Sequence, residues 1–180
     1  MYTQSPVSMA WGAALTVLLL AGCVTDVRDR RIPNALVLGI IAGGLSFSLA
    51  TRPVGTAFAY SLEGLLLGFV IWIVFHIAGV IGAGDVKFFS AAGTWLGPSA
   101  TWRAALVAGV VGGVLAVFFL LRERRFTSTL RRLVLAASSK STAVLVDLPD
   151  RGAASRRQLP YGVALAAGAL AAAWVPRLVR

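Results

Sequence analysis

Cysteine, histidine and acidic residues are all scarce in this chain. Its 180 residues include one cysteine, one histidine and seven aspartates or glutamates. A single cysteine excludes a disulfide framework and a Cys-x-x-Cys metal pair within the chain. Residues Leu20 to Cys23 are similar to a lipoprotein processing site. An export signal, however, requires a positively charged start, and no Lys or Arg precedes these residues. We therefore interpret that match as accidental, and we expect neither a cofactor nor a metal site.

Charged residues of either sign are also sparse, and their scarcity excludes a soluble domain. They make up 13% of the chain, whereas a soluble domain has about 25%. Hydrophobic residues make up 58%, and they come in blocks near the ~20 residues that cross a bilayer as a helix. The sequence therefore predicts an all-α, polytopic membrane helix bundle, with residues 1–180 forming a single membrane-embedded domain.

Charged and turn-forming residues divide the apolar sequence into about six transmembrane helices. Gly97 and Pro98 end the fourth segment, because glycine and proline both interrupt helices. That segment is short for a complete crossing. The six segments are expected at approximately residues 8–25, 35–50, 56–81, 85–96, 102–121 and 159–175.

Glycines at four-residue spacing recur in three of these segments. Small residues at this spacing let helix backbones approach closely in lipid. We interpret the pairs as packing within one bundle in preference to a dimer interface, and the oligomeric state stays open. The pairs are Gly39 and Gly43, Gly64 and Gly68, and Gly109 and Gly113.

Basic residues are distributed unevenly between the two sides of this layout. Thirteen of the seventeen Lys and Arg residues fall on the side that holds Asp26 and Asp85. By the positive-inside rule that side faces the cytoplasm, and both termini lie outside. The formal net charge of +10 is therefore the orientation signal of a cell-membrane protein, and we expect no nucleic-acid partner.

The longest basic connection covers residues 122–158 and is expected in the cytoplasm. Its composition shifts to Arg, Ser, Thr and Asp with scattered apolar residues. Residues 126–137 have the pattern of a basic amphipathic helix that lies on anionic headgroups. The remainder is typical of a flexible loop. We favour orientation and solvation over substrate docking as the role of this connection.

Two aspartates, Asp26 and Asp85, stand at the cytoplasmic ends of apolar segments. A carboxylate within the membrane costs about 2.5–3.5 kcal/mol on insertion scales, so its presence usually indicates a function. Structural roles are open to both, because Asp26 could pair with a following arginine and Asp85 could cap a helix. Two carboxylates that meet would instead share one proton, as in aspartic proteases.

The residues around these aspartates are more specific than the aspartates themselves. The glycines near Asp85 have no side chain, so they permit unusual backbone angles and let another segment of backbone come close. The surrounding residues are Arg30, Arg31, Pro33 and Asn34 after Asp26, then Gly82, Gly84 and Lys87 around Asp85, and a late run from Leu159 to Gly162. In this order and spacing, over nearly the whole chain, they resemble the type IV prepilin peptidase family of membrane aspartic proteases.

The resemblance implies a GxGD-protease-like architecture with Asp26 and Asp85 as the catalytic pair. It implies an endopeptidase that removes the basic leader from type IV prepilin-like precursors at the cytoplasmic membrane face. The expected partners are a prepilin precursor and membrane lipid. Lys87 matches a recurrent family position.

Larger members of that family carry an additional cytoplasmic region with paired cysteines and also methylate the new N-terminus. This chain begins directly with the first segment and has one cysteine. We therefore expect peptidase activity without methyl transfer, as in the short peptidases of Flp/Tad-type pili.

Two other classes of protein stay open as alternatives. A small ion-coupled membrane transporter would also carry isolated intramembrane acids, and a non-catalytic pilus-assembly membrane protein would need none of this chemistry. The transporter alternative does not explain the residues around the two aspartates. In the third segment, we interpret His76 as the partner in an interhelical hydrogen bond and Glu63 as an interfacial charge.

Overall fold

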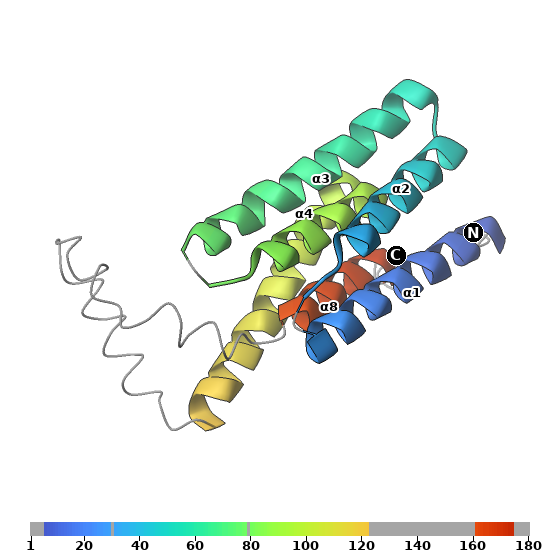
Figure 1. Ribbon diagram of the computed structural model, residues 1–180. Coiled ribbons are helices and arrows are strands. Elements are labelled where there is room, and N and C mark those ends of the chain that lie inside the picture. The colour runs from blue at the N-terminus through green and yellow to red at the C-terminus, as the bar shows by residue number, and fades with distance from the viewer. Residues whose placement is uncertain (1–5, 30, 79, 123–160, 175–180) are drawn as a thin grey trace, which may run out of the picture. The chain divides into compact units, whose positions relative to one another are not determined.

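The computed structural model describes residues 6–29, 31–78, 80–122 and 161–174. Every regular element within these ranges is a helix (Figure 1). The chain divides into two units, and of the second, residues 113–159, only the end of one helix is described. The first unit comprises residues 1–112 and 160–180. The helices are α1 (Pro6–Asp29), α2 (Asn34–Thr51), α3 (Val54–Ile77), α4 (Ala83–Arg122) and α8 (Tyr161–Trp174).

Four helical stretches are long and apolar enough to cross a membrane, so the chain is a multi-pass membrane protein. They are Met9–Asp29, Asn34–Thr51, Val54–Ile77 and Ala83–Leu115. The prediction for the second segment is confirmed to within one residue at each end. The predicted basic loop at 122–158, with its amphipathic stretch at 126–137, lies outside the described residues, apart from Arg122.

The predicted ends of the first and third segments are wrong. α1 continues past residue 25 to Asp29, because no glycine or proline stands between Thr25 and Pro33 to stop it. α3 ends at Ile77, not at 81. Its C-cap residue is Ala78, whose backbone N–H bonds back to the carbonyl of Val74.

The first part of α4 is the centre of the bundle. Residues 88–97 are all buried, as expected for a helix that is apolar or small on every side. The ring of Phe88 fills the space over Gly22 of α1, and Gly93 meets Gly64 of α3 backbone to backbone. A side chain at any of these three glycines would overlap the neighbouring helix, so small residues set the spacing of the helices here.

The glycine pairs are accordingly part of the internal packing, although not at every position. An added Cβ would overlap a neighbour at Gly43 and Gly64, and would lie 3.1 Å from a backbone atom at Gly68. Among the described residues, Gly39 and Gly109 have no neighbour within 4 Å of such a Cβ. The prediction of close packing is confirmed for the first three glycines and wrong for the last two.

α4 breaks at Gly97, which adopts a φ of 67° and a ψ of 177°. Only glycine adopts this left-handed region without strain. Pro98 has no N–H, so the carbonyl of Thr94 loses its helical donor. The hydroxyl of Ser61 in α3 donates to that carbonyl at 3.2 Å, which satisfies it in a place where water is scarce. The predicted break at Gly97 and Pro98 is confirmed.

The chain turns back at this break (Figure 1). Phe88, before the break, lies against the end of α1, and Gly112, after the break, approaches the ring of Tyr161 at the start of α8. The start of α8 lies beside the end of α1, so both parts of α4 reach the same end of the unit. We call it the aspartate end, and the end where α2 finishes and α3 begins is the opposite end. Residues 83–96 are about 20 Å long, shorter than the ~30 Å of bilayer hydrocarbon.

Candidate active site

A contact between α1 and α4 aligns the two sequence-predicted aspartates. Gly22 receives the ring of Phe88. Asp26 follows Gly22 by four residues and Asp85 precedes Phe88 by three, so each aspartate shares a helix face with its contact residue. Because α1 and the first part of α4 run in opposite directions, both carboxylates reach the aspartate end.

Asp26 is held by the start of α8. Its Oδ2 accepts a hydrogen bond of 3.1 Å from the backbone N–H of Gly162. The first N–H groups of a helix lack internal partners and carry the positive end of its dipole, so they stabilise a carboxylate. Asp26 lies in the last turn of α1, where its own helix disfavours an acid. In the described part of the chain it pairs with neither Arg28 nor Arg31.

Asp85 is held by the start of its own helix. α4 begins at Ala83, so Asp85 occupies the third helical position and is not the N-cap. Its Oδ2 accepts a hydrogen bond of 3.2 Å from the N–H of Gly82, the residue before the helix. An acid at the third position that bonds back to this N–H forms one half of a capping box. Asp85 therefore does cap the helix, but it does so from the third helical position and not as the N-cap residue.

His76 connects to Asp85 through a single peptide group. Its Nδ1 lies 3.0 Å from the carbonyl oxygen of Ile81, and it donates this hydrogen bond, because a carbonyl only accepts. The Ile81 carbonyl and the Gly82 N–H belong to one planar unit, so the bonds from His76 and to Asp85 fix that unit from both sides. Hydrogen bonds in series also polarise one another. The interhelical interpretation of His76 is wrong, because it bonds the connection after its own helix.

The two carboxylates lie close enough for the charge of Asp26 to act on Asp85. Tyr161, from the start of α8, lies within range of the charge on Asp85. Both aspartates are only partly exposed, and ionising two neighbouring acids costs Coulomb energy, so such a pair tends to hold one proton. Within the described ranges, no three His, Cys, Asp or Glu side chains gather closely enough to hold a metal ion.

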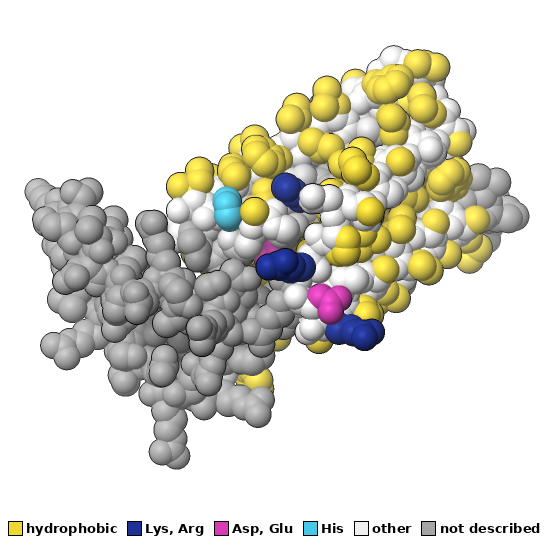
Figure 2. All heavy atoms as spheres, viewed as in Figure 1, with side chains coloured by type: hydrophobic (Ala, Val, Ile, Leu, Met, Phe, Trp, Pro, Cys, Tyr) yellow, Lys and Arg dark blue, Asp and Glu magenta, His cyan; other side chains and the backbone are white. Residues whose placement is uncertain are grey.

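Charged side chains mark this end of the molecule on the face in Figure 2, where blue, magenta and cyan atoms interrupt a mainly yellow surface. Most of the remaining face is hydrophobic, as expected for helices that face lipid. Charges concentrated at helix ends belong at the level of the headgroups. The carboxylate pair therefore lies at the end of the apolar helices that carries these charges.

The other sequence-predicted residues lie around the pair. Arg31, Pro33, Asn34 and Lys87 are exposed, and Arg30 lies outside the described residues. Pro33 is the N-cap residue of α2, and no side chain caps that end. Asn34 is the first helical residue of α2.

Gly82 and Gly84 do not use the backbone freedom of glycine. Among the described glycines, only Gly97 has a positive φ. An added Cβ would lie 3.4 Å from Oδ2 of Asp85 at position 82, and 3.8 Å from Cβ of Ile32 at position 84. Both are ordinary contact distances. The expectation of unusual backbone angles is wrong here, whereas the approach of the 31–33 connection to Gly84 agrees with the close contact expected of glycine.

Gly162 and His76 are site residues to which sequence reasoning gave no such role. An added Cβ at Gly162 would lie 2.6 Å from Oδ2 of Asp26, so a side chain there displaces the carboxylate. The glycine in the first turn of the last apolar segment was the available signal. Nothing in the sequence pairs His76 with the carbonyl of Ile81.

Fold and site together define the class of protein: a helical, multi-pass membrane protein with a pair of carboxylates at one end of its helices. The chain belongs to the type IV leader peptidase family, whose family model matches residues 13–117. No solved structure matches the chain.

Curated relatives also match the chain. The chain is 31% identical over 130 residues to the "Type 4 prepilin-like proteins leader peptide-processing enzyme" of Escherichia coli O78:H11, covering 67% of this chain and 46% of that protein. It is 32% identical over 113 residues to a "Prepilin leader peptidase/N-methyltransferase" of Klebsiella pneumoniae, covering 59% and 50%. A protein of the same name from Aeromonas salmonicida is 31% identical over 127 residues, covering 66% and 44%. The chain thus spans about half the length of these relatives.

Proposed function

We propose that this protein is a membrane aspartic endopeptidase that cleaves the leader peptide from type IV prepilin-like precursors. Asp26 and Asp85 are the catalytic acids of this proposal. Family membership supports the reaction class. The observation that carries the assignment of residues is that two acids from separate helices approach each other, each bonded to a backbone N–H at a helix start.

The pair supplies general acid–base catalysis in this proposal. One carboxylate is ionised and takes a proton from a water molecule, whose oxygen attacks the carbonyl carbon of the peptide bond. The other is protonated and hydrogen-bonds the carbonyl oxygen as negative charge develops there. When the C–N bond breaks, a carboxyl proton passes to the leaving nitrogen. Neither aspartate is assigned a fixed role, because a coupled pair titrates as a unit.

His76 and Tyr161 assist in different ways. His76 is a positioning residue, since it reaches Asp85 only through the peptide between Ile81 and Gly82. Tyr161 lies near the charge of Asp85, and its hydroxyl is a donor that can meet an oxygen of the substrate.

The membrane topology in this proposal has six segments, with the two parts of α4 as the fourth and fifth and α8 within the sixth. The aspartate end faces the cytoplasm, because most basic residues of the sequence lie on that side. The cut is then made at the cytoplasmic boundary of the precursor, next to its hydrophobic helix.

We further propose that this chain does not methylate its product. Cys23 is the only cysteine of the chain, so no paired-cysteine site can form within it. The Sγ atom of Cys23 lies 3.7 Å from the carbonyl oxygen of Gly162. Methylated product from the purified protein and a methyl donor would contradict this part of the proposal.

The test is cleavage of candidate prepilins by purified protein in lipid nanodiscs. Asp26→Asn and Asp85→Asn keep the shape of each side chain and remove its ionisation, so each should lower the rate by about 10³-fold or more. Asp29→Asn is the matched control: Asp29 is exposed in the same last turn of α1, and its loss should leave the rate unchanged.

The outcomes separate the alternative classes. A pilus-assembly protein without catalysis would cleave nothing in any variant. A transporter would show ion flux into liposomes that is lost in the Asn variants, with no cleavage. Normal turnover by either Asn variant would remove that aspartate from the mechanism.

A further inference from the structure

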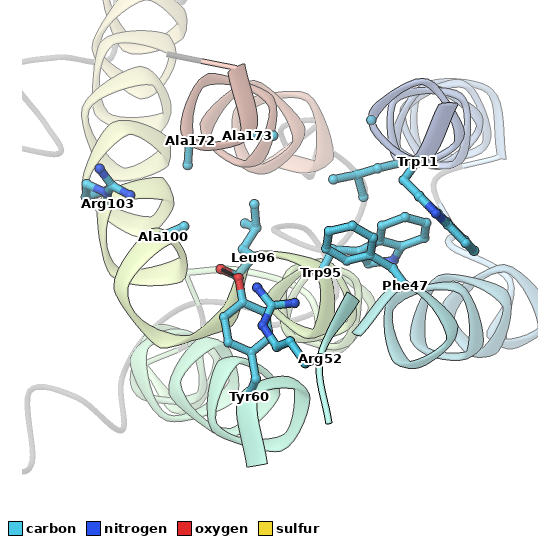
Figure 3. A pocket seen from close by; sticks show the side chains of 12 residues that line it. Trp11, Phe47, Arg52, Tyr60, Trp95, Leu96, Ala100, Arg103, Ala172 and Ala173 are labelled. Carbon is cyan, nitrogen blue, oxygen red and sulfur yellow. Dashed lines mark hydrogen bonds between the residues drawn. The ribbon is translucent and has the colours of Figure 1, made fainter. Parts of the chain in front are cut away.

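A cavity of about 200 Å³ lies at the opposite end of the bundle, away from the aspartates (Figure 3). Residues of all five described helices line it, together with Arg52 of the connection between α2 and α3. The cavity is next to the break in α4, where the hydroxyl of Tyr60 donates to the carbonyl of Leu96 at 2.5 Å. The catalytic proposal uses none of these residues.

One wall of the cavity is aromatic and rigid. Trp95 stacks on Phe47 with ring centroids 5.9 Å apart, and Trp11 meets Trp95 edge-on at 6.0 Å. The indole N–H of Trp95 donates to the carbonyl of Ile40 at 2.7 Å. Its polar atom is therefore satisfied without water. This wall offers apolar surface in a fixed shape, which favours an apolar occupant.

Two arginines flank the same cavity in Figure 3, Arg52 and Arg103. The guanidinium of Arg52 lies 3.6 Å from the ring centroid of Tyr60 and donates to the hydroxyl of Thr51 at 3.0 Å. A guanidinium has five N–H donors, and in the described part of the chain neither arginine forms an ion pair. Donors and positive charge therefore remain available for an anion.

Only an amphiphile satisfies both halves of this site. A free anion would leave the aromatic wall unused, and an apolar solute would leave both arginines without a counter-charge. Tryptophan, tyrosine and arginine at helix ends belong at the headgroup level of a bilayer. Ligand pockets for whole molecules usually have about 300–1,000 Å³, so this cavity has room for one part of a ligand.

We propose that this cavity binds an anionic phospholipid from the leaflet at the opposite end. Its phosphate pairs with Arg52 and Arg103, and part of one acyl chain enters between Trp11, Trp95 and α8. The lipid then fills the space beside the break in α4. This site is independent of the proposed peptidase reaction.

The test uses the tryptophans of the wall as reporters. Nanodiscs of phosphatidylcholine are doped with phosphatidylglycerol that carries a brominated acyl chain, which quenches nearby indole fluorescence. Brominated phosphatidylcholine at the same mole fraction is the headgroup comparison. At low mole fractions, brominated phosphatidylglycerol should quench wild type more strongly.

Two variants divide the site into its halves. Arg52→Gln with Arg103→Gln should weaken the preference for phosphatidylglycerol by about fivefold for each arginine lost. Ala173→Phe, on α8, fills the cavity and should reduce the quenching while every charge is kept. Arg28→Gln with Arg31→Gln removes the same charge at the aspartate end and should leave the preference intact.

Equal quenching of wild type by the two lipids would overturn the proposal. So would a preference that survives the loss of both arginines, because it would come from another basic surface. If Ala173→Phe does not fold, the arginine variants still decide the outcome, since those side chains lie at the edge of the bundle.

Discussion

Asp26 and Asp85 occupy equivalent chemical surroundings that the chain builds in different ways. Each carboxylate accepts one hydrogen bond from the N–H of a glycine at a helix start. For Asp85 that glycine is three residues away, and for Asp26 it is 136 positions away. One half of the site is therefore local, and the other depends on the packing of α1 against α8.

This difference determines how each half can be damaged. The bond of Asp85 is local: it forms whenever the first turn of α4 is helical, because Gly82 and Asp85 belong to the same turn. The bond of Asp26 exists only if two helices approach without an intervening side chain. The Asp26 half should therefore be the more sensitive to small changes in volume.

The largest effect of this kind is expected for Gly162→Ala. The new Cβ would lie 2.6 Å from Oδ2 and 3.0 Å from Cγ of Asp26, which is closer than real atoms approach. The carboxylate is the flexible end of a side chain, so it should rotate away while the helices stay in place. A misplaced catalytic group can cost about 10²-fold in rate, and cleavage of a prepilin by the purified variant measures it.

Gly109→Ala is the matched control, because nothing lies within 4 Å of a Cβ at that position. Its cleavage rate should match that of wild type, and its melting temperature should not fall, because alanine favours a helix over glycine. Wild-type cleavage by Gly162→Ala would show that the bond from α8 does not position Asp26.

A smaller effect is expected when the local half loses its outer support. His76→Ala removes the hydrogen bond to the carbonyl of Ile81 and leaves the Gly82 N–H free to turn. The loss of one hydrogen bond should lower kcat by about tenfold, with KM little changed because His76 acts on Asp85 through the peptide between Ile81 and Gly82. His76→Asn retains a donor and should restore part of the rate.

Glu63→Gln serves as the control for His76, since it removes the carboxylate of α3 and Glu63 is exposed. It should cleave as wild type does. If His76 only stabilised the fold, the variants would change thermal stability, and kcat would not recover from His76→Ala to His76→Asn. That result would contradict a positioning role.

The local features of the fold were predictable from the sequence. The break at Gly97 and Pro98 follows from the residues themselves, because proline lacks an N–H and glycine alone adopts the observed φ without strain. The second segment is bounded by proline and was located to within one residue. The end of α1 was not, because a run of Asp, Val and Arg residues neither favours nor prevents one more turn.

The site divides in the same way. Asp85 and its glycines could be recognised because their interaction is contained in one turn. The bond between Asp26 and Gly162 depends on which helices become neighbours, and a helical sequence pattern does not encode partners for its buried face. For the same reason the sequence predicts an interhelical partner for His76, whereas its partner in the structure is the connection that follows α3.

The smallest effect in this comparison is expected for Gly84→Ala. An added Cβ meets only Ile32, at 3.8 Å, and alanine favours a helix over glycine by up to about 1 kcal/mol. With no protein atom forced to move, cleavage should change by less than about threefold. Gly82→Ala, with a contact of 3.4 Å to Asp85, is the companion measurement and should behave alike. A large loss at position 84 with an unchanged melting temperature would have one physical cause: substrate backbone must pass over Gly84 in the catalytic complex. The local half of the site would then bind the peptide as well as hold an acid.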